Sequence, residues 1–204
     1  MKESKKSLIL CIICAVLAIA FTAVVYFTGL RDTLGAFSYS DLWYKITKYS
    51  GYALFLPVAF FVLLGFVQFI KRKSFKKVDR ELKLLALFYL AVAIVYLVFE
   101  KFLIINYRPI MLDGKLESSY PSSHTLFAVT LCGSAMLLTK RFLKLKHATL
   151  VNIVLVLLML VTVVGRLLSG VHWATDIIGG ILIGATLIFA FATALKAKPA
   201  KTKE

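Results

Sequence analysis

Charged residues are scarce in this sequence. Asp, Glu, Lys and Arg make up 17% of the 204 residues, whereas apolar residues make up 60%, and the mean hydropathy is +0.87. A soluble domain carries about 25% charged and about 45–50% apolar residues. A soluble globular domain and a disordered chain are therefore both excluded, and the length allows a single compact domain.

Acidic residues and cysteines are also few. Ten Asp and Glu stand against 25 Lys and Arg, which gives a formal net charge of +15. A chain this apolar and this basic is typical of an integral membrane protein with its cations at the lipid headgroups, not at a nucleic acid. Three cysteines lie in apolar runs (Cys11, Cys14 and Cys132). No second pair or nearby histidine completes a metal site, so we expect ordinary packed or lipid-facing thiols.

Long apolar runs predict an all-α protein, a bundle of six transmembrane helices. A membrane helix needs about 20 mainly apolar residues, and six stretches approach or meet this length, at about 8–30, 51–70, 82–99, 123–139, 148–164 and 173–195. The first run continues to Leu30, which is longer than the core of a signal peptide, so we expect a retained anchor helix. We also expect a short helix lying flat at the membrane surface over residues 40–48.

Positive charge predicts the orientation of these spans. With both termini in the cytoplasm, the inner segments carry 18 Lys and Arg residues and the outer segments carry seven. Cytoplasmic loops are enriched in Lys and Arg, so we expect a cell-membrane protein with both termini inside.

The remaining polar residues fall in two outer segments. One lies between the third and fourth spans and holds Lys101, Arg108 and His124; the other lies between the fifth and sixth and holds Arg166 and His172. Both segments follow odd-numbered spans, so they share one face of the membrane whatever the absolute orientation. Three cations at the bilayer edge repel one another and are costly without an anion, and a phosphate dianion would satisfy them.

Local spacing adds chemistry to this cluster. Asp176 follows His172 by four residues, which puts both side chains on one helix face, where a carboxylate orients an imidazole and makes it more basic. Ser122 and Ser123 open the fourth span, where free backbone N–H groups favour an anion. Each feature alone has a structural explanation, such as an interfacial anchor or a helix cap. Their occurrence together on one face favours a phosphate site.

Three motifs resemble the signature of the type 2 phosphatidic acid phosphatase (PAP2) superfamily, which also includes haloperoxidases. The first is Lys101, six residues, then Arg108-Pro109. The second is Pro121-Ser122-Ser123-His124, where the family has Gly at the third position. The third is Gly165-Arg166, five residues, His172, three residues, Asp176, where the family has Ser at the first position.

This resemblance implies a role for each matching residue. Lys101, Arg108 and Arg166 would hold the phosphoryl oxygens, with Ser122 and the backbone around Ser123 stabilising their charge. His172 would attack phosphorus and form a phosphohistidine, with Asp176 orienting it. His124 would protonate the departing oxygen. The resemblance implies no metal and no cofactor.

The sequence therefore predicts a membrane lipid phosphatase with its site at the outer face. The expected substrates are an isoprenoid diphosphate such as undecaprenyl diphosphate, phosphatidic acid or phosphatidylglycerophosphate. A lipid phosphotransferase with the same intermediate and a non-catalytic lipid-phosphate binder or transporter stay open as alternatives. Gly180 and Gly184 form a G-x-x-x-G pattern, which fits close packing inside the monomer or formation of a homodimer.

Overall fold

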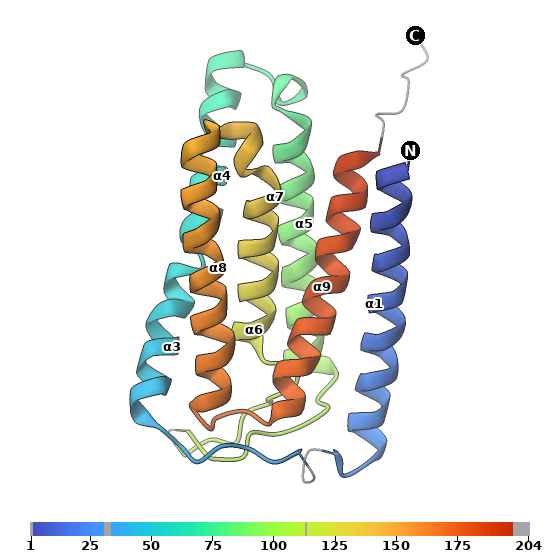
Figure 1. The fold of residues 1–204 in the computed structure, drawn as a ribbon, viewed down its shortest axis with the longest axis vertical. Helices are drawn as coiled ribbons and strands as arrows, with labels where there is room; N and C mark the ends of the chain where they lie inside the picture. The colour runs from blue at the N-terminus through green and yellow to red at the C-terminus, as the bar shows by residue number, and fades with distance from the viewer. Residues whose placement is uncertain (1, 31–33, 113, 198–204) are drawn as a thin grey trace.

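The computed structural model describes residues 2–30, 34–112 and 114–197 and is an up-and-down bundle of helices (Figure 1). Arg31, Lys198, Lys201 and Lys203, which contribute to the predicted charge bias, lie outside the described residues. The helices are α1 (Lys2–Phe27), α3 (Asp41–Ala53), α4 (Leu56–Arg72), α5 (Arg80–Leu97), α6 (Ser123–Phe127), α7 (Gly133–Phe142), α8 (Leu145–Leu168) and α9 (Ala174–Lys196). Isolated bridges aside, the described residues contain no β-strand, and the all-α prediction is confirmed.

Five segments are long and apolar enough to cross a membrane: Glu3–Phe27, Asp41–Arg72, Arg80–Phe102, Leu145–Leu168 and Ala174–Lys196. The sixth crossing is α6 and α7, joined without a break by the π-helical turn η3 (Ala128–Cys132). This helix runs through the middle of the bundle (Figure 1). The chain is therefore a multi-pass membrane protein with the predicted six-helix architecture.

The central helix is rich in small and hydroxylated residues because it is surrounded by protein. Leu126, Ala128 and Cys132 are fully buried, and Thr130 donates its hydroxyl to the Leu126 carbonyl at 2.7 Å. Such local bonds satisfy a hydroxyl inside a membrane bundle. In contrast, α1 lies at the edge of the bundle beside α9 (Figure 1) and exposes large aliphatic side chains such as Ile19.

The second crossing consists of two helices. Ser40 caps α3 by accepting a bond from the Trp43 backbone N–H, and Pro57 lies in the first turn of α4. Proline lacks a backbone N–H and collides with the preceding turn, so a continuous helix is interrupted here. The short flat helix predicted at residues 40–48 is instead a 13-residue helix that runs obliquely and leads directly into α4 (Figure 1).

The loops that carry the three motifs meet at one end of the bundle. Residues 103–112, 114–122 and 169–173 lie together there, opposite the end where α1 begins and α9 finishes (Figure 1). The prediction that both polar segments share a face is confirmed by this arrangement. Trp173 ties the two loops together because its indole N–H donates to the Tyr107 carbonyl at 2.7 Å.

The G-x-x-x-G pair is used inside the monomer. A Cβ on Gly180 would come within 3.0 Å of the Thr125 side chain, and one on Gly184 would come within 2.9 Å of Val129. Both glycines are buried, and they let α9 approach α6 and η3 closely. Of the two predicted explanations, these contacts support packing inside the monomer.

Candidate active site

The imidazole of His172 lies between an acidic and a basic side chain, Asp176 and Arg166. Its Nδ1 is 3.3 Å from Oδ2 of Asp176, and its Nε2 is 3.0 Å from Nη2 of Arg166. The imidazole is 1% exposed and the carboxylate is fully buried. Asp176 is held in place by the Trp173 backbone N–H, which donates to the same carboxylate oxygen at 2.9 Å. The predicted one-turn spacing of His172 and Asp176 therefore produces a direct contact.

These contacts define where the imidazole proton resides. A guanidinium only donates hydrogen bonds, so Nε2 of His172 must accept from Arg166. The ring proton is then on Nδ1, where it can be donated to Asp176. This tautomer leaves the Nε2 lone pair on the side of Arg166, which is the arrangement that a nucleophilic histidine needs.

The His172 ring is neutral in this setting. Burial is the main cause that holds the pKa of His172 well below its usual range, and the positive charges of Arg166 and Arg108 lower that pKa further. Both causes disfavour a second proton on the ring. Nε2 is therefore unprotonated at neutral pH.

A cleft of about 390 Å³ opens beside this cluster. It lies between α3, α5, the 103–122 loop, α6 and α8. Its polar lining consists of Tyr44, Lys48, Tyr52, Arg108, Glu117, Ser123, His124 and Arg166, and its apolar lining includes Leu54, Phe55, Tyr96, Leu112 and Phe127. His172 and Asp176 do not line the cleft; Arg166 lies between them and it. The cleft thus has a cationic end and an aromatic wall.

Buried polar atoms around the cleft lack partners. Within the described part of the chain, Nε and Nη1 of Arg108, Nε of Arg166 and Nδ1 of His124 are buried without a hydrogen bond. The remaining Arg108 nitrogen, Nη2, pairs with Glu117 at 3.0 Å. Buried donors are normally satisfied, so several unmet ones around one cavity indicate a missing acceptor. An anion with several oxygens fits this need better than a neutral ligand.

The structure brings most of the predicted site residues together, with two differences. Ser122 is buried at the start of α6, where its hydroxyl accepts from Thr125 at 3.2 Å, and it does not reach the cleft; Ser123 does. Lys101 belongs to the π-helical turn η2 (Val98–Phe102). Its side chain is exposed and is not among those lining the cleft. The phosphate-binding role of Lys101 stays a prediction.

Helix α3 adds site residues that the motifs do not contain. Thr47 is fully buried and accepts a hydrogen bond from Nη1 of Arg166 at 3.4 Å. A Cβ on Gly51 would lie 2.9 Å from Nε2 of His124, so this glycine lets the imidazole rest against α3. The only sign of these two contacts in the sequence is the occurrence of hydroxylated and small residues in an amphipathic stretch. Such residues do not specify which side chains they will contact.

Gly165, which stands where the family has Ser, packs against the same helix. A Cβ at this position would come within 2.5 Å of the Thr47 methyl group and 3.2 Å of the Trp43 ring. The absence of a side chain therefore allows α3 to approach α8 closely enough for Thr47 to reach Arg166. The family hydroxyl is missing, and a hydroxyl from another helix bonds to the arginine instead.

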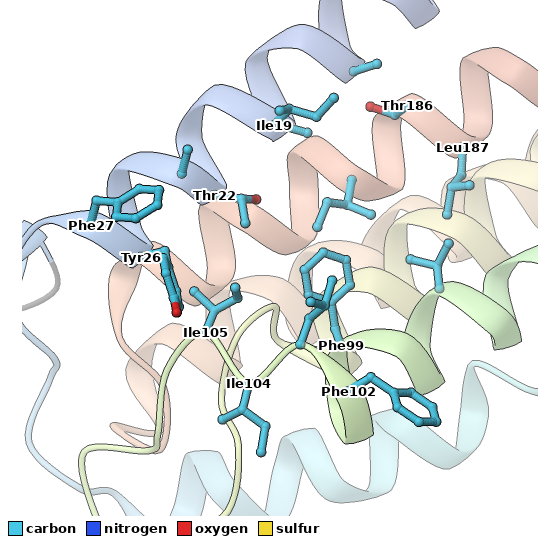
Figure 2. Close-up of a pocket in the computed structure, with 16 residues that line it drawn as sticks. Ile19, Thr22, Tyr26, Phe27, Phe99, Phe102, Ile104, Ile105, Thr186 and Leu187 are labelled. Carbon is cyan, nitrogen blue, oxygen red and sulfur yellow. The ribbon is translucent and has the colours of Figure 1, made fainter.

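A second, larger cavity lies between α1, α5 and α9 and has a different character (Figure 2). It measures about 670 Å³ and is lined almost entirely by aliphatic and aromatic side chains, among them Ile19, Phe27 and Phe99. Its threonines are satisfied, because Thr22 bonds to the Tyr120 hydroxyl at 2.7 Å and Thr186 donates to the Leu182 carbonyl. This cavity carries no group for phosphate chemistry.

In residues 2–30, 34–112 and 114–197, no three His, Cys, Asp or Glu side chains are grouped so that they could hold a metal ion. The cations that line the cleft are Lys48, Arg108 and Arg166, and they lie there with His124 and the carboxylate of Glu117.

Comparisons with known proteins agree with this geometry. Residues 101–199, about half of the chain, match the family model described as the PAP2 superfamily. No curated protein sequence matches. Among solved structures, the chain is similar to the "first transmembrane PAP2 type phosphatidylglycerolphosphate phosphatase from Bacillus subtilis", with 20% identity, a TM-score of 0.56 and 100% of both chains covered. At this identity the likeness shows the fold. The matched segment contains all three motifs, and the predicted resemblance to the PAP2 superfamily is confirmed by this match.

Proposed function

We propose that this protein is a membrane lipid phosphatase that transfers a phosphoryl group to His172 and then to water. The observation that carries the proposal is the position of the neutral His172 ring, between Asp176 and an arginine at the edge of a cleft with unmet buried donors. The match of residues 101–199 to the PAP2 superfamily model and a fold shared with a membrane phosphatase support the same activity.

The cleft suits a lipid that carries a phosphate. Its cationic end would hold the headgroup, and its wall of Phe55, Tyr96 and Phe127 would contact the first carbons of the tail. The aromatic rings of Phe55 and Phe127 lie 5.9 Å apart, and those of Tyr96 and Phe127 lie 5.2 Å apart. The proposed substrates are an isoprenoid diphosphate such as undecaprenyl diphosphate, phosphatidic acid and phosphatidylglycerophosphate. The last is the substrate class named for the similar Bacillus subtilis structure.

Binding begins with exchange of partners at the two arginines. A phosphate dianion is a stronger acceptor than a neutral imidazole or a half-exposed carboxylate, so it draws Arg166 away from Nε2 of His172 and Arg108 away from Glu117. Ser123 and the nearby backbone N–H groups supply further donors. Ser122 supports this segment from beneath, and Lys101 is kept as a phosphate-binding residue on the resemblance alone.

The first chemical step forms a bond between Nε2 of His172 and phosphorus and breaks the bond from phosphorus to the lipid oxygen. The imidazole becomes positively charged, and the Asp176 carboxylate stabilises that charge through Nδ1. Once the phosphate anion is bound beside it, the His124 ring carries a second proton, which it gives to the departing oxygen. The arginines stabilise the charge on the equatorial oxygens of the transition state.

The second step regenerates the enzyme. His124, now neutral, takes a proton from a water molecule, which attacks phosphorus and breaks the bond to Nε2. The products are inorganic phosphate and the free lipid, and both histidines return to their starting state. The proposal needs no metal, because the arginines supply the positive charge that Mg²⁺ supplies in many phosphoryl transfers.

The proposed orientation puts the chemistry at the outer membrane face with both termini in the cytoplasm. Its support is the excess of Lys and Arg on the side of the termini and the position of the loops that carry the cleft residues, at the opposite end of the bundle (Figure 1). A lipid whose tail stays in the outer leaflet can then present its phosphate to the cleft without leaving the membrane.

The test is release of inorganic phosphate by the purified protein in detergent micelles with EDTA present. We expect turnover of at least one of the three lipids by the wild type and a loss of at least a thousandfold in His172→Ala. His147→Ala is the matched control, since His147 lies at the far end of α8, and it should stay within twofold. Equal phosphate release by the wild type and His172→Ala would refute the proposal, and a phosphorylated acceptor in place of free phosphate would indicate a phosphotransferase.

A further inference from the structure

One face of α3 forms a wall of the cleft. Tyr44, Lys48, Gly51 and Tyr52 all line it. The last three follow Tyr44 by four, seven and eight residues, and these spacings keep all four positions on one side of a helix. The register of this face is set by two contacts, because Thr47 bonds to Arg166 and Gly51 rests against His124. A turn of α3 about its axis would break both contacts.

Lys48 thereby becomes the third cation of the cleft. Arg108 and Arg166 are the other two, and Glu117 is the carboxylate that lines the cleft with them. Glu117 lies 3.0 Å from Arg108 and is therefore already engaged. By comparison, Lys45 on the same helix pairs with Asp41 at 2.7 Å, and both residues are well exposed. The two lysines of α3 thus differ in what they face.

The position of Lys48 separates it from the two arginines. Arg166 is 2% exposed and the Arg108 side chain is 12% exposed, and both have buried nitrogens without a partner in the described part of the chain. Lys48 also lines the cleft but is exposed. A cavity of about 390 Å³ is in the range that holds a whole ligand headgroup, about 300–1,000 Å³, and it has room beyond a single phosphate.

We infer that Lys48 binds a second anionic group of the substrate, so that the cleft selects lipids with two phosphates over lipids with one. The terminal phosphate lies between the arginines, and the second phosphate, in a diphosphate or a phosphodiester, lies against the lysine. Lys48 is a specificity-determining residue that the three motifs do not contain. The inference rests on the proposed function, because it concerns the same cleft.

Farnesyl diphosphate and farnesyl monophosphate test this inference, since they share a tail and differ by one phosphate. We expect Lys48→Gln to raise KM for the diphosphate roughly tenfold, the effect of one partly exposed charge-assisted hydrogen bond. KM for the monophosphate and kcat for both lipids should change less than twofold. Lys48→Arg should restore most of the diphosphate KM, and Lys45→Gln should behave as the wild type.

A binding measurement separates this inference from the phosphatase proposal. In the His172→Ala background turnover is expected to be at least a thousandfold slower, so the affinity for each farnesyl lipid can be measured directly. We expect Lys48→Gln to weaken diphosphate binding roughly tenfold and monophosphate binding less than twofold. Equal weakening of both lipids, or no weakening of either, would overturn the role of Lys48 whether or not the wild type releases phosphate.

Discussion

The two cavities of this protein differ in almost every chemical respect. The cavity between α1, α5 and α9 is larger, about 670 Å³ against about 390 Å³, and its polar groups are satisfied. The cleft beside α3 is smaller, yet buried nitrogens of Arg108, Arg166 and His124 around it have no hydrogen-bond partner among the described residues. A buried unmet donor is costly, whereas an apolar surface in a membrane is covered by lipid tails. We therefore assign the proposed activity to the cleft with the unpaired buried nitrogens and not to the larger cavity.

The difference also shows how the bundle tolerates buried charge. Arg166 is almost fully buried, and desolvation of such a cation costs several kcal/mol. Contacts to Thr47 and His172 offset part of this cost, and an anion in the cleft would offset more of it.

Four changes can break or sharpen the contrast between the two cavities, and they follow from the largest expected effect to the smallest.

The largest effect is expected at His124, and it depends on the leaving group. Substitution by Gln should reduce kcat about a thousandfold on phosphatidic acid, which releases an alkoxide and depends on a proton donor. On an isoprenoid diphosphate, whose leaving group is a stable phosphate ester, the reduction should be about tenfold. The measurement is phosphate release from the two lipids under identical micelle conditions. Equal reductions would remove the assignment of His124 as the acid.

Gly165→Ser, which restores the residue of the family motif, should lower kcat/KM about tenfold or more. The new Cβ would meet the Thr47 methyl group at 2.5 Å, which displaces α3 and with it the partner of Arg166. Thr47→Ala should recover part of the loss, so the double variant should be more active than additivity predicts. Gly65→Ser is the control because a Cβ there has open space. A fully active Gly165→Ser variant would contradict this packing.

Lowering the pH should lower the free energy of unfolding, because His172 is protonated more readily in the unfolded chain than in the folded protein. The pKa of this residue is lowered in the folded protein, so its neutral form contributes stability that is fully present above the unfolded pKa of about 6.5 and is lost as the pH falls. Between pH 7 and pH 5 this loss amounts to at most about 2 kcal/mol. Thermal unfolding in detergent should show a smaller fall in Tm for His172→Asn than for the wild type. Identical falls would argue against a neutral buried ring.

The smallest effect is expected in the apolar cavity. Ala23 lines it and is exposed, and Ala23→Leu should change phosphate release less than twofold because no reacting group is nearby. A loss of more than tenfold would show that the two cavities are coupled and would break the contrast. A loss of phosphate release confined to long-tailed lipids would sharpen the contrast, because it would identify the apolar cavity as a site for the lipid tail.

Much of the site was predictable because its key contact is local. The pairing of His172 with Asp176 follows from a separation of four residues at the start of a helix, and their placement on the same face as His124 follows from counting spans. Lys101 illustrates the limit of this reasoning. It belongs to the π-helical turn η2, where its side chain is exposed and does not line the cleft, and sequence spacing does not reveal such a turn.

The contributions of α3 were out of reach for a different reason. Thr47 and Arg166 are separated by 119 positions. Gly51 and His124 belong to two different helices, α3 and α6. The sequence of an amphipathic stretch does not predict which part of the protein its apolar face will pack against. Gly165 appeared as a departure from a motif, and its meaning depends on a side chain supplied by another helix.

The sequence by itself determined the membrane class, the six crossings and the face on which the motifs meet, because long apolar runs and one-turn spacings act through local physics. The tertiary structure alone decided which side chains line the cleft and which buried arginine nitrogens have no hydrogen-bond partner among the described residues. Those features depend on close packing between distant helices, where the presence or absence of a single Cβ sets how near two backbones can come.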